Sequence, residues 1–186
     1  MSKNKAEFLE LRKKIMERDF SRMNDSQREA VFCTEGALLI LAGAGSGKTT
    51  VLINRIANMV KYGKAYESTR TPDVISDNDI ALLSAAAAGT ASPEQLSRAV
   101  ALCAVAPCPA WRILAITFTN KAAGELKERL SRMLGEDSSE IQASTFHSFC
   151  ARILRRDGDR LGYSNHFTIY DTDDSIRLMK DCMRSL

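Results

Sequence analysis

Apolar residues near the start of the chain recur at helical spacing. Between residues 5 and 20 they fall every three or four positions, at Phe8, Leu11, Ile15 and Met16. This spacing places the four side chains on one face of an amphipathic helix, with Lys, Arg and Glu opposite. The pattern predicts a leader helix within residues 1–22 and a second helix over 26–32.

Three continuous apolar runs are typical of strands buried on both faces of a parallel sheet. Each run is followed by a helical pattern, so the chain repeats a strand-helix unit. The strands are expected at 37–42, 113–116 and 141–144, and the helices after them at 51–60, 120–134 and 146–156. Such repetition predicts an α/β fold with a right-handed parallel sheet, although short apolar runs alone are ambiguous between a strand and a buried helix.

The stretch 63–110 separates the first and second units and does not continue the repeat. It begins with polar residues and then predicts two helices, 77–88 closed by Gly89 and 93–106 with Ser92 as its N-cap. We interpret it as a helical hairpin inserted into the core domain. Its alanine-rich, weakly charged helices favour a packing element over a DNA or partner contact.

The composition of the chain limits its domain number, partners and location only loosely. A chain of 186 residues with 45% apolar content can bury one ordinary core. Its 26 basic and 23 acidic residues give a net charge of +3, which many proteins indifferent to nucleic acid share. Five cysteines without a C-x-x-C pair and only two histidines argue against zinc and for reduced thiols. The charged amino terminus and the lack of a long apolar run suggest a cytoplasmic protein without a membrane segment.

The segment A-G-A-G-S-G-K-T at residues 42–49 carries the clearest chemistry. It fits the phosphate-binding loop G-x-x-x-x-G-K-[ST], except that alanine replaces the first glycine. Glycines let backbone N–H groups converge on phosphate oxygens, and the following helix adds its positive end. The loop therefore predicts binding of ATP with Mg²⁺. The residues expected to hold it are Ala42, Gly43, Ala44, Gly45, Ser46, Gly47, Lys48 for the β- and γ-phosphates, and Thr49 for the metal.

Gln27 lies upstream of this loop within N-D-S-Q-R-E-A-V. A side-chain amide carries both a donor and an acceptor, the pair needed to read the N6 and N7 edge of adenine. Taken alone, a glutamine on an amphipathic helix is more often solvated surface. Its position ahead of the phosphate loop makes adenine recognition the better interpretation.

Four collinear segments together resemble the superfamily 1A helicases of the UvrD/Rep/PcrA type. They are similar to the Q motif, motif I, motif Ia and motif Ib of that family, and they read N-D-S-Q-R-E-A-V at 24–31, L-I-L-A-G-A-G-S-G-K-T at 39–49, I-L-A-I-T-F-T-N-K-A-A at 113–123 and S-T-F-H-S-F-C-A-R-I-L-R-R at 144–156. The resemblance covers most of 24–62 and 111–180, and leaves out the leader and the 63–110 insertion.

The resemblance implies a fold, a partner and a set of site residues. The fold is the front part of a RecA-like ATP-binding domain over 23–165, and the partner is single-stranded DNA, bound weakly without the remaining helicase lobes. Lys48 and Thr49 take the catalytic phosphate and Mg²⁺ roles, Gln27 reads adenine, and Thr50 and Arg55 lie beside the nucleotide. A DNA track is implied at Phe118, Thr119, Asn120, Lys121, Thr145, Phe146 and His147.

Some parts that such a motor requires are not found in the sequence. Phosphoryl transfer needs an aspartate for Mg²⁺, a glutamate that orients water and arginines from a second lobe. The segment 167–174, with Asp171, is the nearest substitute for the acidic strand but lacks the glutamate. By resemblance, 166–186 begins an accessory helical lobe. We therefore expect an incomplete core that binds ATP without turning it over.

Two other functions remain open at this point. A helicase-nuclease subunit of a recombination complex would share these motifs, and a nuclease domain further along the chain would identify it. A nucleotide-binding regulator that never hydrolyses ATP is the alternative outside enzymes. The basic cluster at 152–160 is interrupted by Asp157 and Asp159, so a solvated face is slightly favoured there over a DNA patch.

Overall fold

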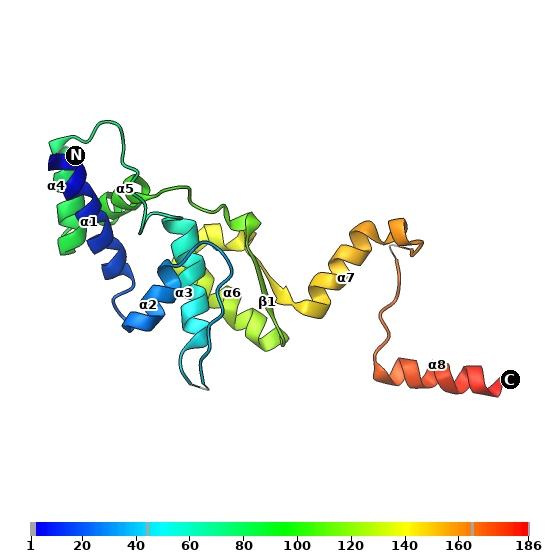
Figure 1. Cartoon of the computed structure of the whole chain (residues 1–186). Coiled ribbons are helices and arrows are strands. Elements are labelled where there is room, and N and C mark those ends of the chain that lie inside the picture. The colour runs from blue at the N-terminus through cyan, green and yellow to red at the C-terminus, as the bar shows by residue number, and fades with distance from the viewer. Residues whose placement is uncertain (1–2, 44, 165, 186) are drawn as a thin grey trace.

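The computed structural model describes residues 3–43, 45–164 and 166–185, and it consists mostly of helices (Figure 1). One group of helices gathers around the amino terminus, and the last two helices extend from the opposite end of the molecule. The strand-helix units lie between them, with a two-stranded parallel sheet. None of the helices in the described ranges is long and apolar enough to cross a membrane.

The first two helices follow the hydrophobic pattern closely. Helix α1 runs Lys3–Asp19 and helix α2 runs Asp25–Phe32. The predicted apolar face of α1 is buried, with Phe8, Ile15 and Met16 no more than 1% exposed. This face packs against the first helix of the insertion, so the leader and the insertion cover one another.

The stretch 63–110, which we call the insertion, contains the two expected helices, with one correction to their bounds. Helix α4 is Asp77–Ala88, as expected, whereas α5 is Pro93–Cys103 and ends before residue 106. Both helices begin with a capping box, which fixes their amino-terminal ends. Helix α5 ends early because Val105 pairs with the chain that follows α3 (Lys48–Lys61). Val105 N donates to the Tyr62 carbonyl, and Lys64 N donates to the Val105 carbonyl.

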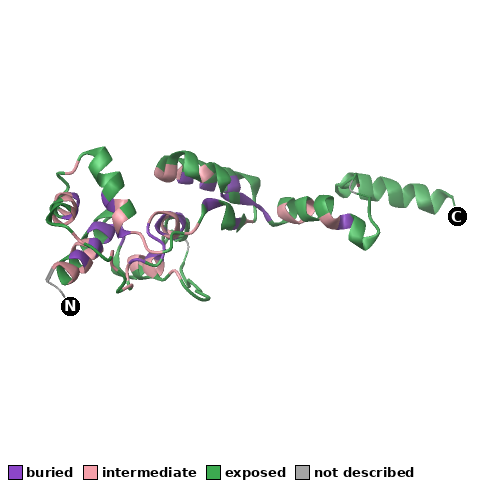
Figure 2. Ribbon diagram, turned by 90° about the horizontal axis from the view of Figure 1, so that it is seen from above, coloured by how far each residue is buried: buried purple, intermediate pink, exposed green. Residues whose placement is uncertain are grey.

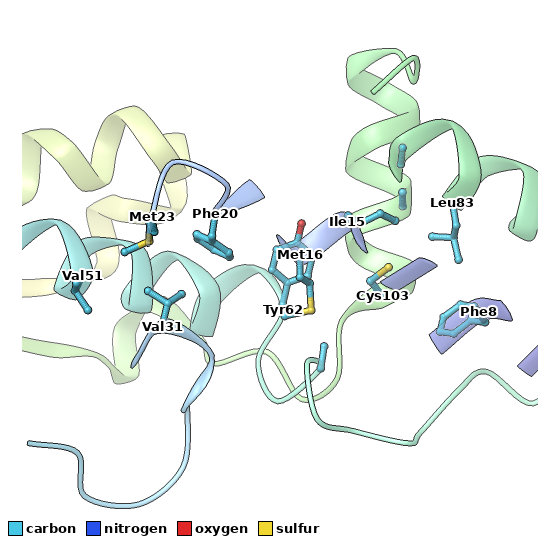
Figure 3. Packing of buried hydrophobic residues seen from close by; sticks show 13 residues of the cluster. Phe8, Ile15, Met16, Phe20, Met23, Val31, Val51, Tyr62, Leu83 and Cys103 are labelled. Carbon is cyan, nitrogen blue, oxygen red and sulfur yellow. The ribbon is translucent and has the colours of Figure 1, made fainter. Parts of the chain in front are cut away.

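One hydrophobic core joins the leader, α2, the end of α3 and the insertion (Figure 3). Phe8 and Met16 of α1 meet Leu83 of α4 and Cys103 of α5, all at zero exposure, and the Tyr62 ring is buried with them. Burying side chains of this size contributes roughly 1.5–3 kcal/mol each. The leader and the insertion are therefore anchored to the helix that carries the phosphate loop.

Polar contacts tie the same elements together. Arg12 of α1 is 1% exposed, and its guanidinium donates to the backbone carbonyls of Ser68 and Arg70. The Tyr62 hydroxyl donates to Asp19 at 2.8 Å. Arg18 donates to the Ala86 carbonyl at 2.6 Å, near the last turn of α4. The arginine bonds pair backbone carbonyl groups of a loop and of a helix end, and the tyrosine bond joins the residue after α3 to the end of α1.

A second core lies under the sheet. Strand β1 is Leu114–Thr117 and β2 is Gln142–Thr145, with α6 (Asn120–Leu134) between them in sequence. The short helical turns η1 (Ala110–Arg112) and η2 (Gly135–Glu140) precede the two strands. Leu126 and Leu130 of α6 pack with Ile53 and Ile56 of α3 and with the sheet. Both strands and the α6 helix agree with the sequence prediction to within one residue.

The predicted strand over 37–42 is wrong for this structure. Within the described residues this segment pairs with no other strand, and Leu39 and Leu41 are 80% and 86% exposed. The apolar run indicates burial, but a strand also needs a neighbour to satisfy its backbone groups. The two strands that do form, β1 and β2, pair with each other.

The last helices carry little buried surface. Helix α7 is Phe146–Asp157 and α8 is Thr172–Arg184, with the turn η3 (Gly158–Leu161) after α7. Figure 2 shows both helices almost entirely as exposed or intermediate residues, and none of their described residues is buried. Asp171, the nearest candidate for an acidic metal ligand, instead caps α8 by accepting from Asp174 N at 2.8 Å.

Candidate functional site

The loop of residues 42–49 turns sharply into the first turn of α3. Gly45 and Gly47 have φ angles of 76° and 82°, which favour glycine, and Gly47 is the N-cap of α3. A Cβ on Gly45 would meet nothing within 4 Å, so the outer side of the loop is open. Ala44, also expected in this site, lies outside the described residues.

Lys48 bends back over its own loop. Its Nζ donates to the Ala42 carbonyl at 3.0 Å and to the Gly43 carbonyl at 2.6 Å. The Gly43 carbonyl also accepts from the Ser46 hydroxyl at 2.7 Å. An ammonium has three donors, so one remains for another acceptor. The exposed ammonium thus lies over the loop, where an anion would compete with the two carbonyls.

Two bonds hold Gln27 against the loop. Its Nε2 donates to the Ser46 carbonyl at 3.1 Å, and its Oε1 accepts from Asn24 N at 3.2 Å. The Asn24 side chain in turn accepts from Gln27 N at 2.9 Å, which completes a capping box at the start of α2. An amide has two donors and two acceptor positions, so one of each stays available. Asn24 was missed from sequence as a supporting residue, although the N-x-x-Q spacing is a capping signal.

Arg55 connects α2 to α3. Its NH1 donates to the Ala30 carbonyl at 2.8 Å and also to the Cys33 carbonyl. Next to it, the buried Asn58 donates to the Val31 carbonyl at 3.0 Å. Both side chains secure the end of α2, and thereby the helix that carries Gln27. A position of Arg55 beside the nucleotide stays a prediction.

The donor set of this loop fits a phosphate group and a hard cation. The first turn of α3 offers unpaired backbone N–H groups and a positive helix end. Lys48 adds an ammonium, and Thr49 and Thr50 are exposed there, so the Thr49 hydroxyl is accessible to a cation. Oxygen donors of this kind suit Mg²⁺, which keeps several of its waters and usually takes few protein ligands.

The parallel register brings the two predicted DNA motifs together. Thr117 at the end of β1 pairs with Thr145 at the end of β2. The residues after these strand ends therefore share one edge of the sheet, which we call the carboxyl edge. At this edge α6 begins with Asn120 and α7 begins with Phe146, so two helix amino termini lie beside each other.

The aromatic and polar side chains at the carboxyl edge face solvent. Phe118 is fully exposed and Phe146 is 57% exposed, with the His147 ring 6.2 Å away from Phe146 in an edge arrangement. Asn120 and Lys121 are also exposed. An exposed phenylalanine face can stack on a base without regard to sequence.

The two threonines expected to contact DNA have structural partners. The Thr119 hydroxyl caps α6 by accepting from Ala122 N at 3.1 Å. The Thr145 hydroxyl caps α7 by accepting from Ser148 N at 3.2 Å, it donates to the Ser148 hydroxyl, and its residue is 7% exposed. Their side chains thus orient the two helices, while the helix N–H groups are the donors that sequence reasoning overlooked at this edge.

The chain is similar to a family of known proteins. A sequence model described as the UvrD/REP helicase N-terminal domain matches residues 23–186. A protein named ATP-dependent DNA helicase PcrA from Staphylococcus epidermidis strain ATCC 35984 is 42% identical over 163 residues, which are 88% of this chain and 16% of that protein. A protein of the same name from Staphylococcus aureus strain Mu50 is 40% identical over 165 residues, which are 89% of this chain and 17% of that protein. The chain thus spans about a sixth of the length of these relatives.

Proposed function

The chain belongs to the UvrD/REP helicase family, and on that basis we propose that it supplies the ATP-binding site of an ATP-dependent DNA helicase. The motor of which it is a part would couple ATP hydrolysis to movement along single-stranded DNA and to duplex separation. The proposed fold is the front part of a RecA-like domain over 23–165, interrupted by the 63–110 hairpin and followed by the start of an accessory lobe.

The observation that carries this proposal is the open glycine loop at the start of α3. Gly45 and Gly47 hold their positive φ angles, and Lys48 rests on the carbonyls of Ala42 and Gly43. A triphosphate would exchange these intramolecular bonds for stronger charge-assisted bonds from the ammonium and the helix N–H groups.

Lys48, Thr49 and Gln27 would have distinct roles in holding ATP. Lys48 would neutralise charge on the β- and γ-phosphates, and the Thr49 hydroxyl would hold Mg²⁺, which screens the phosphate charge during transfer. Gln27 would use its remaining donor and acceptor on the adenine edge. Gln27 already donates to the Ser46 carbonyl, so adenine binding at Gln27 would act directly on the conformation of the phosphate loop.

The carboxyl edge supplies the proposed DNA contact. Phe118 and Phe146 would stack on bases, while Asn120, Lys121 and His147 would take backbone phosphates. Thr119 and Thr145 would act mainly through the helix ends that they cap. Because this chain would supply only one lobe of the motor, its binding of single-stranded DNA should be weak and sensitive to salt.

The similarity to proteins named PcrA favours a plain helicase over the helicase-nuclease alternative and over a regulator that does not hydrolyse ATP. We further propose a cytoplasmic location, supported by the five free cysteines. The 186-residue chain itself should not turn over ATP, because its sequence contains no Asp-Glu pair. Phosphate release that single-stranded DNA stimulates, and that Lys48→Ala abolishes, would contradict this expectation.

Base preference tests the nucleotide site. Binding of fluorescent ATP and GTP analogues with Mg²⁺ should favour ATP for the wild-type chain. Gln27→Ala should remove most of that preference while leaving phosphate binding in place, and Gln95→Ala, in the capping box of α5, is the matched control. A base preference that Gln27→Ala leaves unchanged would reject Gln27 as the adenine reader.

A further inference from the structure

Two surface cavities share Arg152 of α7, one at the start of β2 and one next to the carboxyl edge. The first, of about 430 Å³, lies between α6, η2, β2 and α7 and is lined by Lys127, Arg152, the carboxylate of Glu140 and several polar groups. Ser131, Ser138 and Ser139 add hydroxyl groups, of which the Ser138 hydroxyl already donates to the Gly135 carbonyl at 2.7 Å. The second, of about 440 Å³, is lined by Arg152, Arg155, His147, Ser148, Ala151 and Ile169. Arg152 lies between the two cavities, and His147 of the carboxyl edge lines the second.

Ion pairing divides the basic residues of these helices into two groups. Arg129 pairs with Glu125 at 3.0 Å, Arg132 pairs with Glu128, and Arg156 pairs with Asp157 at 2.8 Å. Lys127, Arg152 and Arg155 have no carboxylate within ion-pair distance among residues 3–43, 45–164 and 166–185. Three of the four such cations that α6 and α7 carry in the described ranges line the two cavities, and the fourth, Lys121, lies at the carboxyl edge.

This division changes the interpretation of the basic cluster at 152–160. The aspartates that interrupt it in sequence do not neutralise it evenly, since Asp157 bonds to its neighbour Arg156 and leaves Arg152 and Arg155 unpaired. Arg155 instead lies over the Phe167 ring, 5.8 Å from its centroid. A guanidinium held by a ring keeps its outward N–H groups for an acceptor.

The chemistry of the two cavities fits a chain of phosphates. Guanidinium groups bind phosphate oxygens in a bidentate manner, lysine adds a point charge, and serine hydroxyls donate single bonds. The second cavity contains no carboxylate among its lining residues, and Ile169 and Ala151 give it an apolar wall against which a sugar can lie. Glu140 is the one acidic side chain along the first cavity.

We propose that Lys127, Arg152 and Arg155, with the hydroxyls of Ser131 and Ser139, form a phosphate strip that holds the backbone of single-stranded DNA beyond the carboxyl edge. This inference rests on the proposed function, because the strand reaches the strip from His147. The carboxyl edge stacks bases and the phosphate strip holds the backbone, so the strip adds affinity without sequence preference.

Fluorescence anisotropy with oligothymidylates of two lengths separates the strip from the edge. A strand of about 5 nucleotides can occupy the edge alone, whereas one of about 20 can reach both. For the long strand, the double variant Lys127→Ala and Arg152→Ala should weaken binding on the order of a hundredfold. The plot of log K against log salt concentration should become less steep by about 1.4, because two phosphate contacts are lost. Binding of the short strand should change little.

Arg132→Ala is the matched control, since it removes a cation of α6 that already has a carboxylate partner. It should leave both affinities near the wild-type values, and circular dichroism should show the helices of each variant intact. Equal losses for both strand lengths, or no loss for the long strand, would overturn the strip while leaving the proposed function standing.

Two further outcomes would be decisive in other directions. A wild-type chain that binds neither strand contradicts the proposed function itself. An acidic peptide of matched charge that displaces the long strand at lower concentration than unlabelled oligothymidylate does would assign the surface to a protein partner and overturn the strip.

Discussion

Two regions of the molecule differ in how much regular structure the chain forms in them. The first is the leader-insertion core of α1, α4 and α5, and the second is the phosphate-loop segment before α3. In the first region α1, α4 and α5 bury Phe8, Leu83 and Cys103 completely. In the second, residues 37–43 belong to no helix or strand, and Leu39 and Leu41 are largely exposed. A helix satisfies its backbone within itself and needs only one apolar partner face, whereas a strand needs a neighbour along its whole length. Local sequence signals are therefore sufficient for the first region and insufficient for the second.

The strongest test of this comparison removes a large side chain from the shared core. Phe8→Ala should lower the free energy of unfolding by about 3–5 kcal/mol, because it leaves a cavity among α1 and the insertion. Phe118→Ala, which truncates a fully exposed ring, should change it by less than about 0.5 kcal/mol. Chemical denaturation gives both values.

Hydrogen exchange extends that test to the insertion. If α1 and α4 share one core, Phe8→Ala should lower amide protection throughout 77–88, which lies far from residue 8 in sequence. Protection of α4 that stays at the wild-type level would show that the insertion folds without the leader.

Replacing one glycine in each region by alanine should have a smaller effect on the free energy of unfolding. Gly63 has a φ of 61°, and an added Cβ would lie 2.4 Å from the carbonyl oxygens of Val105 and Ala106. Gly63→Ala should therefore cost at least about 2 kcal/mol. A Cβ on Gly43 would meet nothing within 4 Å, so Gly43→Ala should stay within about 0.5 kcal/mol in thermal or chemical unfolding. Similar costs at the two positions would argue against the difference between the regions.

Thiol labelling compares the regions without changing their stability. Burial raises the pKa of Cys103 to about 12, which keeps its thiol protonated at pH 8, while Cys33 is exposed at the end of α2. The thiolate is the reactive form, so a disulfide reagent should modify Cys33 promptly and Cys103 only as the core opens. Mass spectrometry of digested samples identifies the modified residue, and prompt labelling of Cys103 would show that the shared core is loose.

The sequence predicted the helices well because their signals are local. Capping residues such as Ser76 and Ser92, and the apolar spacing from Phe8 to Met16, fix helix bounds without reference to distant residues. The strand over 37–42 failed because pairing is a property of two segments. The buried Arg12 and its bonds to the carbonyls of Ser68 and Arg70 were equally invisible, since a sequence gives no sign of which loop a charged side chain will enter.

The candidate site divides in the same way. The phosphate loop and Lys48 follow from a motif whose physical demands are contained in a few consecutive residues. The pairing of Thr117 with Thr145, which brings the two DNA motifs to one edge, depends on the register of β1 and β2. The capping roles of Thr119 and Thr145 became clear only with the helix ends in view, although both residue types are typical N-caps.

The central claim is that the open loop before α3 binds the phosphates of ATP through Lys48. Isothermal titration calorimetry with ATP and Mg²⁺ tests it on the wild-type chain, on Lys48→Ala and on Lys14→Ala, an exposed lysine of α1 paired with Glu10. We predict measurable binding by the wild type and by Lys14→Ala, and a loss of at least about tenfold for Lys48→Ala. Equal ATP binding by all three proteins would contradict the assignment of this loop as the nucleotide site.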